Sequence, residues 1–267
     1  MENETKKYGV YLWGGHFLYL GRLEENVTEH MHHALQVIID RKGEFDLRID
    51  KAPVKCGGVI IGPDRRHQLV SSADTQAHLF IDREEAVARA IARHHLGDKN
   101  FKILDGPLLE RLRGVFNEPD NFLGPCAQAH DVYRKIVTEL GGYAAPAMEA
   151  IDPRIRGVMA LVQEKLFSEK VTIAELARNA CLSESRLMHL FSKQIGIPLR
   201  RYVLWQRVLV AMRMIAQGKM SLTEAAHAAG FSDSAHLSRT YRSMFGLTLS
   251  HCSNLSQFVQ VTSCFSE

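Results

Sequence analysis

The sequence predicts an α+β protein: a small N-terminal β-barrel followed by helices, and then an all-α C-terminal domain. Three observations predict this fold class. Short segments rich in β-branched and aromatic residues recur up to about residue 82, apolar residues then recur at helical spacing, and the last third of the chain contains a helical repeat.

The N-terminal segments are typical of strands separated by turns. Glycine, proline, aspartate and asparagine punctuate them, as at Gly14-Gly15 and Gly62-Pro63-Asp64. Many short strands at this spacing favour a barrel or a sandwich. The expected strands are Tyr8–Leu12, Phe17–Leu20, Ala34–Ile39, Phe45–Ile49, Val59–Ile61 and Ala77–Ile81.

Helical spacing begins after Asp82, and the stretch from Gly141 to Ile151 is typical of a linker. The expected helices before that linker cover residues 84–96, 107–116 and 127–140. The predicted domains are a barrel at 1–100, a helical dimerisation segment with its linker at 101–150, and a helical domain at 151–252.

The helix expected at 127–140 carries a broad apolar stripe that includes Val132, Tyr133, Ile136 and Leu140. The stripe is wider than a single barrel needs. It therefore predicts a surface that packs against a second subunit of a homodimer.

Charge is divided unevenly along the chain. Residues 152–267 hold 14 Lys and Arg against 8 Asp and Glu, whereas the remainder holds 19 against 22. A basic C-terminal part indicates a polyanionic partner for that part alone.

Cysteine usage and hydropathy indicate a cytoplasmic protein. The 5 cysteines are widely spaced, with no C-x-x-C and no metal-finger spacing, which predicts reduced thiols. The N-terminus is polar, without a signal-peptide stretch, and no apolar run approaches the roughly 20 residues that span a bilayer. We expect no membrane partner.

Two segments of the C-terminal part repeat each other. Thr172–Ser183 matches Ser221–Ser232 at an offset of 49, and after one inserted residue the offset becomes 50, so that Phe191 matches Tyr241. Each copy opens on a capping box, Thr172-x-x-Glu175 or Ser221-x-x-Glu224, which starts a helix. A turn at Cys181-Leu182 or Gly230-Phe231 follows, and Ser183 or Ser232 then caps the next helix. This pattern predicts two helix-turn-helix units, each with its second helix as the DNA reader.

A helix expected at residues 199–217 joins the two units, and Gly218 ends it. Nineteen helical residues span about 28 Å. Because this is close to the roughly 34 Å between successive major-groove faces, the helix can present both readers to one side of a duplex.

The C-terminal part resembles the AraC/XylS family of bacterial transcription regulators over about residues 152–251. The residues that carry the resemblance in the first unit are Ala177, Ser183, Arg186-Leu187, Phe191, Gly196 and Tyr202; in the second they are Ala225-Ala226, Ala229–Asp233, Leu237–Arg239, Tyr241-Arg242 and Phe245–Thr248. The N-terminal part is similar to the cupin-type barrel of many family members, on His30-Met31-His32-His33-Ala34-Leu35-Gln36, Gly62-Pro63 and His67. The resemblance implies a regulator that binds double-stranded DNA, an effector-binding or dimerising barrel, and contact with RNA polymerase.

The resemblance also implies which side chains meet DNA. The expected base contacts are Ser185, Met188 and His189 in the first unit and Ser234, Ala235 and Arg239 in the second. Arg239 is the foremost of these, because arginine holds guanine O6 and N7 bidentately. The expected phosphate contacts are Arg186, Lys193, Arg200, Arg201 and Arg242, each of which is equally consistent with solvated surface charge.

His30, His32 and His67 are the candidate residues of an N-terminal pocket. Alternate strand positions place His30 and His32 on one face. Enzymatic cupins also supply a carboxylate shortly after the histidine pair, where Gln36 stands here. The sequence therefore predicts an effector pocket with no bound metal, no other cofactor and no catalytic residues.

Two alternatives stay open. The first is a metal-dependent cupin enzyme, such as a dioxygenase, fused to a DNA-binding module. The second is a constitutive DNA binder whose barrel is only a dimerisation scaffold. Neither the effector nor the choice between activator and repressor follows from the sequence.

Overall fold

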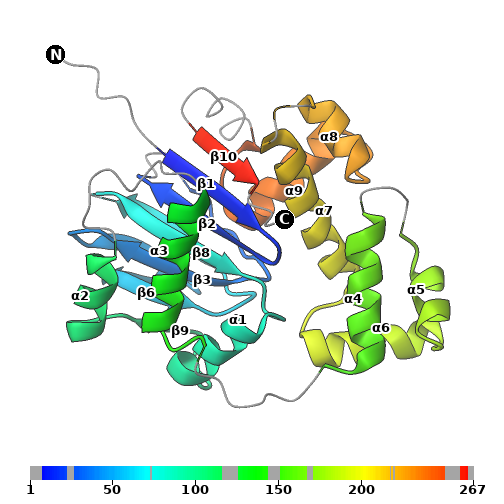
Figure 1. Ribbon diagram of the computed structural model, residues 1–267, viewed down its shortest axis with the longest axis horizontal. Coiled ribbons are helices and arrows are strands. Elements are labelled where there is room, and N and C mark those ends of the chain that lie inside the picture. Colours follow the sequence, from blue (N-terminus) through cyan, green and yellow to red (C-terminus); the bar gives the residue numbers. More distant parts are fainter. Residues whose placement is uncertain are drawn as a thin grey trace. The chain divides into compact units, whose positions relative to one another are not determined.

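The computed structural model describes residues 8–22, 27–72, 74–115, 126–143, 151–166, 171–216, 218 and 220–249, and the backbone of 259–263. The chain forms two compact units (Figure 1). One comprises Met1–Pro146 with Tyr241–Glu267, and the other comprises Ala147–Thr240.

The N-terminal unit contains a seven-stranded sheet in the order β10-β1-β2-β8-β3-β6-β9 and a three-stranded sheet in the order β5-β4-β7. The strands are β1 (Tyr8–Trp13), β2 (His16–Gly21), β3 (Leu35–Asp40), β4 (Phe45–Ile49), β5 (Ala52–Cys56), β6 (Gly58–Ile61), β7 (His67–Ser72), β8 (Gln76–Ile81), β9 (Phe101–Ile103) and β10 (Val259–Ser263). All six expected strands are confirmed. The described strands form two sheets and no closed barrel, which corrects the expected closure, because the ladders of β4, β5 and β7 join these three strands to one another and to no strand of the large sheet.

The large sheet is buried on both of its faces, and strand alternation assigns each side chain to one of them. In β3, Leu35, Val37 and Ile39 point into the core beneath the helices. Ile38 points into a second core that also contains Phe45 and other residues of the small sheet. Every residue of β3 and β8 is buried, which is why both strands are continuous apolar runs with a few polar residues.

Four helical segments cover the outer face of the large sheet: α1 (Ala86–Ile91), the π-helical turn η1 (Ala92–Leu96), α2 (Gly106–Gly114) and α3 (Cys126–Glu139). Figure 1 shows α3 lying across the strands. Val132, Tyr133, Ile136 and Leu140 belong to this core and are between 0% and 5% exposed. The apolar stripe therefore packs on its own sheet and offers nothing to a second subunit, contrary to the interface expected from the sequence.

The expected domain boundary at residues 100 and 101 is absent. β9 pairs antiparallel with β6, and Leu109 and Leu112 of α2 join the same core as β3 and β8. The segment predicted to be a dimerisation element thus completes the N-terminal fold.

The remaining helices are α4 (Pro153–Lys165), α5 (Ile173–Asn179), α6 (Glu184–Ile195), α7 (Leu199–Ala216), α8 (Leu222–Ala228) and α9 (Ser234–Phe245). α5 with α6, and α8 with α9, are the two predicted helix-turn-helix pairs. The predicted joining helix is α7, which ends just before Gly218 at φ +66°.

Both turns end their first helix with the same hydrogen-bond pattern. Leu182 N–H donates to Ala177 O and Phe231 N–H donates to Ala226 O, each at 2.9 Å. The residue at the centre of each turn is left-handed, Cys181 at φ +52° and Gly230 at φ +80°. This is the Schellman termination, and it normally carries glycine.

The start of each unit differs in detail. Ser221 and Glu224 form the complete capping box. In the first unit Glu175 N–H donates to the Thr172 hydroxyl at 3.3 Å, but the Glu175 carboxylate accepts from Lys165 instead of closing the box. Half of the expected box is therefore replaced by a link to α4.

Two further expectations bear on thiols and membranes. Cys56 and Cys181 are free thiols, but Cys126 is disulfide-bonded, so the prediction of wholly reduced cysteines is wrong for Cys126. In the part of the chain that the structure describes, no helix is long and apolar enough to cross a membrane.

The unequal turns give a stability prediction. Gly230→Ala should lower the free energy of unfolding by about 1–2 kcal/mol, because a left-handed residue with a Cβ is strained. Cys181→Gly removes the same strain and should leave that free energy unchanged or higher. Urea unfolding followed by circular dichroism measures both, and equal losses in the two variants would contradict the assignment of the turns.

Candidate nucleic-acid interface and a buried histidine cluster

The two helices predicted to read DNA, α6 and α9, are called the reading helices below, and each has one buried and one exposed face. In α6, Leu187, Phe191 and Ile195 are buried. The candidate base contacts lie on the other side: Ser185, Met188, His189, Ala235 and Arg239 are exposed, and Ser234 is half-buried. Each helix thus presents its predicted contacts to solvent.

The N-cap of α9 differs from the expectation. Ser183 caps α6, since its hydroxyl accepts from Arg186 N–H at 3.2 Å. In α9 it is Asp233, and not Ser232, whose carboxylate accepts from His236 N–H at 2.6 Å. This bond also lowers the pKa of Asp233. Aspartate is a favoured N-cap residue, so Asp233 could have been predicted as the cap from the sequence, where Ser232 was chosen instead.

The position of the cap fixes the register between the two reading helices. The residue inserted between the repeats lies at the cap, so the helices align at an offset of 50 from their first residue. His189 and Arg239 then occupy the same helical position, as do Ser185 and Ala235. The two reading helices therefore carry different side chains at equivalent helical positions.

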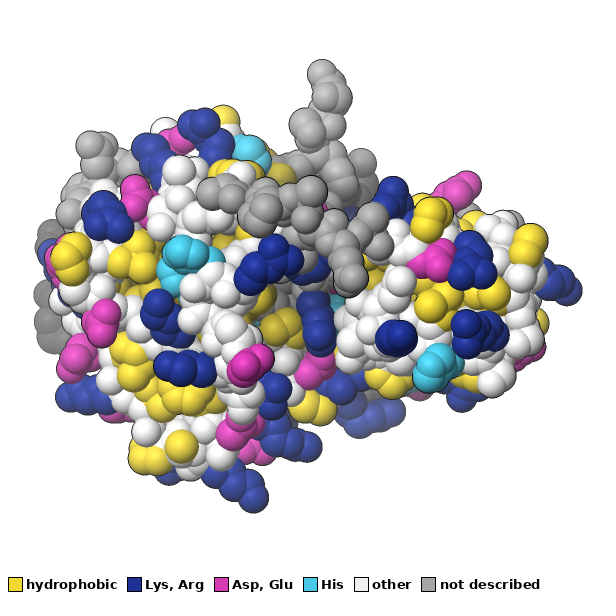
Figure 2. Space-filling model, turned by 90° about the horizontal axis from the view of Figure 1, so that it is seen from below, with side chains coloured by type: hydrophobic (Ala, Val, Ile, Leu, Met, Phe, Trp, Pro, Cys, Tyr) yellow, Lys and Arg dark blue, Asp and Glu magenta, His cyan; other side chains and the backbone are white. Residues whose placement is uncertain are grey.

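The candidate phosphate contacts are also accessible. Arg186, Lys193, Arg200 and Arg242 are exposed, and Arg201 is half-buried. On the face shown in Figure 2, Lys and Arg side chains are spread over the surface and do not gather in one patch. On this face, charge alone does not mark a nucleic-acid site.

α7 packs against both helix-turn-helix pairs. Tyr202, Trp205, Val208 and Leu209 are at most 5% exposed, and the rings of Phe191 and Tyr202 lie 5.2 Å apart. Much of α7 is buried, because α6 of the first helix-turn-helix pair and α8 of the second both pack against it. Its 18 residues span about 27 Å.

In the N-terminal unit the structure brings His30, His32 and His67 together. All three are buried, and one potential ligand atom from each lies within 4.8 Å of the others. His30 and His32 do not lie on a regular strand as expected. An isolated antiparallel bridge instead joins His30 to His67, with two backbone hydrogen bonds of 2.9 Å.

The three imidazoles share one hydrogen-bond arrangement. Nδ1 of His30 lies 2.8 Å from Thr28 O, Nδ1 of His32 lies 3.0 Å from Ala34 O, and Nδ1 of His67 lies 2.8 Å from Arg65 O. A carbonyl accepts only, so Nδ1 carries the proton in each ring and Nε2 carries the lone pair. Nε2 of His67 is buried and has no hydrogen-bond partner among the described residues.

Burial favours the neutral form of the clustered imidazoles and of the neighbouring His78. It lowers the pKa of His32 and of His78 to about 3 and the pKa of His67 to about 4. The pKa of His30 is also well below its usual value, first through burial and then through the neighbouring His67. The cluster is therefore neutral at neutral pH.

His33 has the opposite character. Burial acts to lower its pKa, but the nearby Asp64 and Glu84 carboxylates outweigh burial and raise the pKa to about 9. His33 Nε2 lies 2.8 Å from Glu84 Oε2, and the two side chains are 2% and 5% exposed. This is a buried ion pair beside the cluster.

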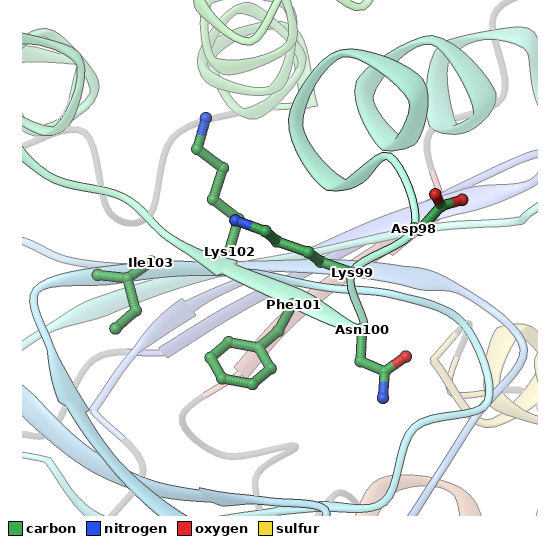
Figure 3. Close-up of a pocket in the computed structure, with 6 residues that line it drawn as sticks. All are labelled: Asp98, Lys99, Asn100, Phe101, Lys102 and Ile103. Atoms are coloured by element: carbon green, nitrogen blue, oxygen red, sulfur yellow. The ribbon is translucent and has the colours of Figure 1, made fainter.

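A surface hollow lies elsewhere in the N-terminal unit, along β9 (Figure 3). Its lining is the continuous segment Asp98–Ile103, with Lys99 and Lys102 on one side of the strand and Asn100 and Phe101 on the other. It contains none of the predicted site residues.

The comparisons with known proteins concern both parts of the chain. A model described as a helix-turn-helix domain matches residues 176–254. A protein described as the probable transcriptional regulator LumQ of Photobacterium leiognathi is 33% identical over 250 residues, which are 85% of this chain and 92% of that protein. The chain belongs to the AraC/XylS family of transcription regulators.

Other relatives agree with this membership. The arabinose operon regulatory protein of Salmonella typhimurium is 30% identical over 96 residues, covering 36% of this AraC-type chain and 34% of that regulator. A structure of ToxT from Vibrio cholerae bound to an unsaturated fatty acid shares the fold, with a TM-score of 0.58, 12% identity and 100% coverage of both chains. The predicted helix-turn-helix regulator is thus confirmed, with an N-terminal β domain.

The buried ion pair gives a prediction for this AraC-type regulator. His33→Ala should lower the free energy of unfolding by about 3–5 kcal/mol, because the Glu84 carboxylate is left buried and unpaired. His33→Ala combined with Glu84→Ala should cost less than the sum of the single changes. Exposed His94→Ala is the control and should stay within about 0.5 kcal/mol. Additive losses in urea titrations would show that the two side chains do not interact.

Proposed function

We propose that this AraC-type transcription regulator reads its DNA site with α6 and α9 and that its N-terminal domain answers to a small effector. The observation that carries the DNA part is the shared register of two exposed helix faces on one supporting helix. Because each cap fixes where its helix begins, equivalent positions face outward in both units.

The two helices divide the reading. Arg239 is exposed and stands where an arginine can make a bidentate contact with guanine O6 and N7. The first unit presents Ser185, Met188 and His189, which suit thymine methyl groups and groove shape more than guanine. Ser234 and Ala235 complete the second set.

The exposed cations position the protein on the duplex. Arg186, Lys193, Arg200 and Arg242 are supported as phosphate contacts by their exposure next to the reading helices, and Arg201 is supported less because it is half-buried. Such contacts contribute affinity and salt dependence but no base preference.

The effector part rests on the histidine cluster and on a relative. His30, His32 and His67 converge between the two sheets of the N-terminal unit. ToxT, which has this fold, holds an unsaturated fatty acid in one structure. Together these observations support a ligand-responsive N-terminal domain at this cluster.

The remaining parts of the proposal concern partners and chemistry. We infer a cytoplasmic homodimer that contacts RNA polymerase, and the dimer needs a surface other than Val132, Tyr133, Ile136 and Leu140. We also infer that the chain binds and does not catalyse. Among the described residues, the histidine cluster contains no carboxylate of the kind that enzymatic cupins supply.

Arg239 provides the test of base reading. Arg239→Ala should weaken binding to the preferred site by about 1–3 kcal/mol and relax base preference at one position. The preferred site is selected from a random duplex pool, and affinities are then measured over single-base variants. An equal loss on preferred and random DNA would show that Arg239 positions the protein and does not read.

Arg200→Ala is the matched comparison for phosphate contact. It should weaken binding to all sequences alike and reduce the slope of log affinity against log salt by about one unit. A loss confined to the preferred site, with an unchanged salt slope, would move Arg200 from the phosphate set to the reading set.

A further inference from the structure

Arg207, in the middle of α7, is a half-buried cation without a partner in the part of the chain that the structure describes. Its Nε–H is buried and has no acceptor among the described residues, whereas its two Nη groups are not fully buried. Burial lowers the pKa of Arg207, and no described carboxylate raises it. A guanidinium that has lost part of its hydration and gained no anion is costly, so this side chain is left with acceptors to find.

The guanidinium lies against the turn between α8 and α9. A Cβ atom on Gly230, the left-handed residue of that turn, would lie 3.1 Å from Arg207 Nε and 3.4 Å from Arg207 Nη2. Gly230, Ala235 and Arg239 are all exposed. Arg207 is thus placed beside an exposed turn that leads directly into the outer face of the second reading helix.

Both acidic residues of the second helix-turn-helix pair are engaged in helix caps. In the first pair the Glu175 carboxylate accepts from Lys165 of the preceding helix, α4. The equivalent Glu224 of the second pair instead closes the capping box with Ser221. The cation that the preceding helix α7 brings to the second pair, Arg207, therefore receives no carboxylate from this position.

Asp233, the second of these acidic residues, is engaged in the same way. Its carboxylate accepts from His236 N–H at 2.6 Å and from the Ser232 hydroxyl at 2.9 Å. These hydrogen bonds lower the pKa of Asp233, and Arg239, not Arg207, is the cation that acts on it. The second pair thus has no carboxylate for Arg207, which points to an anion supplied by a bound partner.

Arg207 also continues a row of positive charge along α7. It follows Arg200 by about two helical turns, so both side chains leave the helix on nearly the same side. The two positions are about 10 Å apart along the helix axis. Arg200 is exposed and is already a candidate phosphate contact, and Arg207 lies further along the same row, next to the turn.

We propose that Arg207 binds one backbone phosphate of the DNA at the turn that precedes α9. The planar guanidinium fork matches two oxygens of a phosphodiester group, which is the anion that a DNA-binding helix pair meets. Because the side chain is already packed against Gly230, it has less conformational freedom to lose than an exposed arginine has. The inference rests on the proposed function, in which α9 reads DNA, and adds a residue absent from the phosphate contacts expected from the sequence.

Arg207→Met is the variant that separates this role from a structural one. The methionine keeps a long side chain over the turn and removes an unpaired, half-buried charge, so the free energy of unfolding should be unchanged or higher. Binding should weaken by about tenfold for the preferred and for random duplexes alike, and the slope of log affinity against log salt should fall by about one unit. A structural arginine predicts the reverse, which is lower stability with an unchanged salt slope.

Two further variants of the full chain serve as controls. Arg207→Lys keeps the charge without the fork, so it should keep the salt slope while retaining only part of the affinity. Arg93→Gln removes a charge from an exposed position of η1 in the N-terminal unit and should leave affinity and slope unchanged. Circular dichroism and urea unfolding check that each variant is folded.

Methylphosphonate substitution in the DNA locates the contact, since it removes the charge of one phosphate at a time. One substitution should weaken binding of the unchanged protein by about tenfold and have no further effect on Arg207→Met. If Arg207→Met does not fold, Arg207→Lys carries the comparison, because loss of the fork should reduce the cost of removing that phosphate. An unchanged salt slope, or no phosphate whose substitution loses its effect in the variant, overturns the proposal. If Arg239→Ala still relaxes base preference, the reading role of α9 stands, whereas a chain that binds no duplex overturns both.

Discussion

The N-terminal unit depends on one constraint, which is that both faces of its large sheet are buried. One face meets helices and the other meets a second sheet, so β3 and β8 expose nothing. Apolar residues satisfy this directly. Polar residues on the inner face cannot reach water and must pair with one another, since an unpaired buried polar group costs about 1–3 kcal/mol. The hydrogen-bonded contacts of Gln76 with Asp40 and His78, and of His78 with Gln36, follow from that constraint.

The helical unit depends on a different constraint, the geometry of its caps and turns. One residue is inserted between the repeats just before the second reading helix. Asp233 takes over the capping role that Ser183 has in the first helix-turn-helix pair, so that α9 begins one residue later than the repeat predicts. The inserted residue lies before α9 begins. Positions within α6 and α9 therefore correspond at a constant offset of 50. The caps therefore set which side chains lie on the exposed face of each helix.

The sequence predicted most of the fold where local chemistry decides it. β-Branched segments gave six strands, and duplicated caps gave both helix pairs. Three further strands were missed. β5 contains Pro53 and is mostly exposed, β7 has only two buried residues, and β9 has only three residues in all. The apolar stripe of α3 was predicted correctly, but its assignment to a homodimer interface was wrong, because the stripe packs on the sheet of its own subunit. Periodicity shows that a face is buried and does not show what covers it.

The candidate sites were predictable to different degrees for a similar reason. The reading residues follow from helix register, a local property. The histidine cluster depends on the isolated bridge between His67 and His30, and no local sequence pattern predicts that pairing. The contacts of Gln76 with Asp40 and His78 were not predicted, because they depend on the pairing of β3 with β8. Asp40 opposite Gln76 and Ile38 opposite His78 place these groups on one inner face.

The tautomers of the histidine cluster also bear on which kind of ligand the N-terminal domain can take. Nδ1 of His30 and of His67 each meet a backbone carbonyl, so Nε2 of each ring offers a lone pair. Nε2 of His67 is buried and has no hydrogen-bond partner among the described residues. A ligand that donates hydrogen bonds meets these lone pairs favourably, whereas a carboxylate, such as the head of a fatty acid, does so only if a proton comes with it. The cluster therefore suits a protonated acid or another hydrogen-bond donor better than a bare anion.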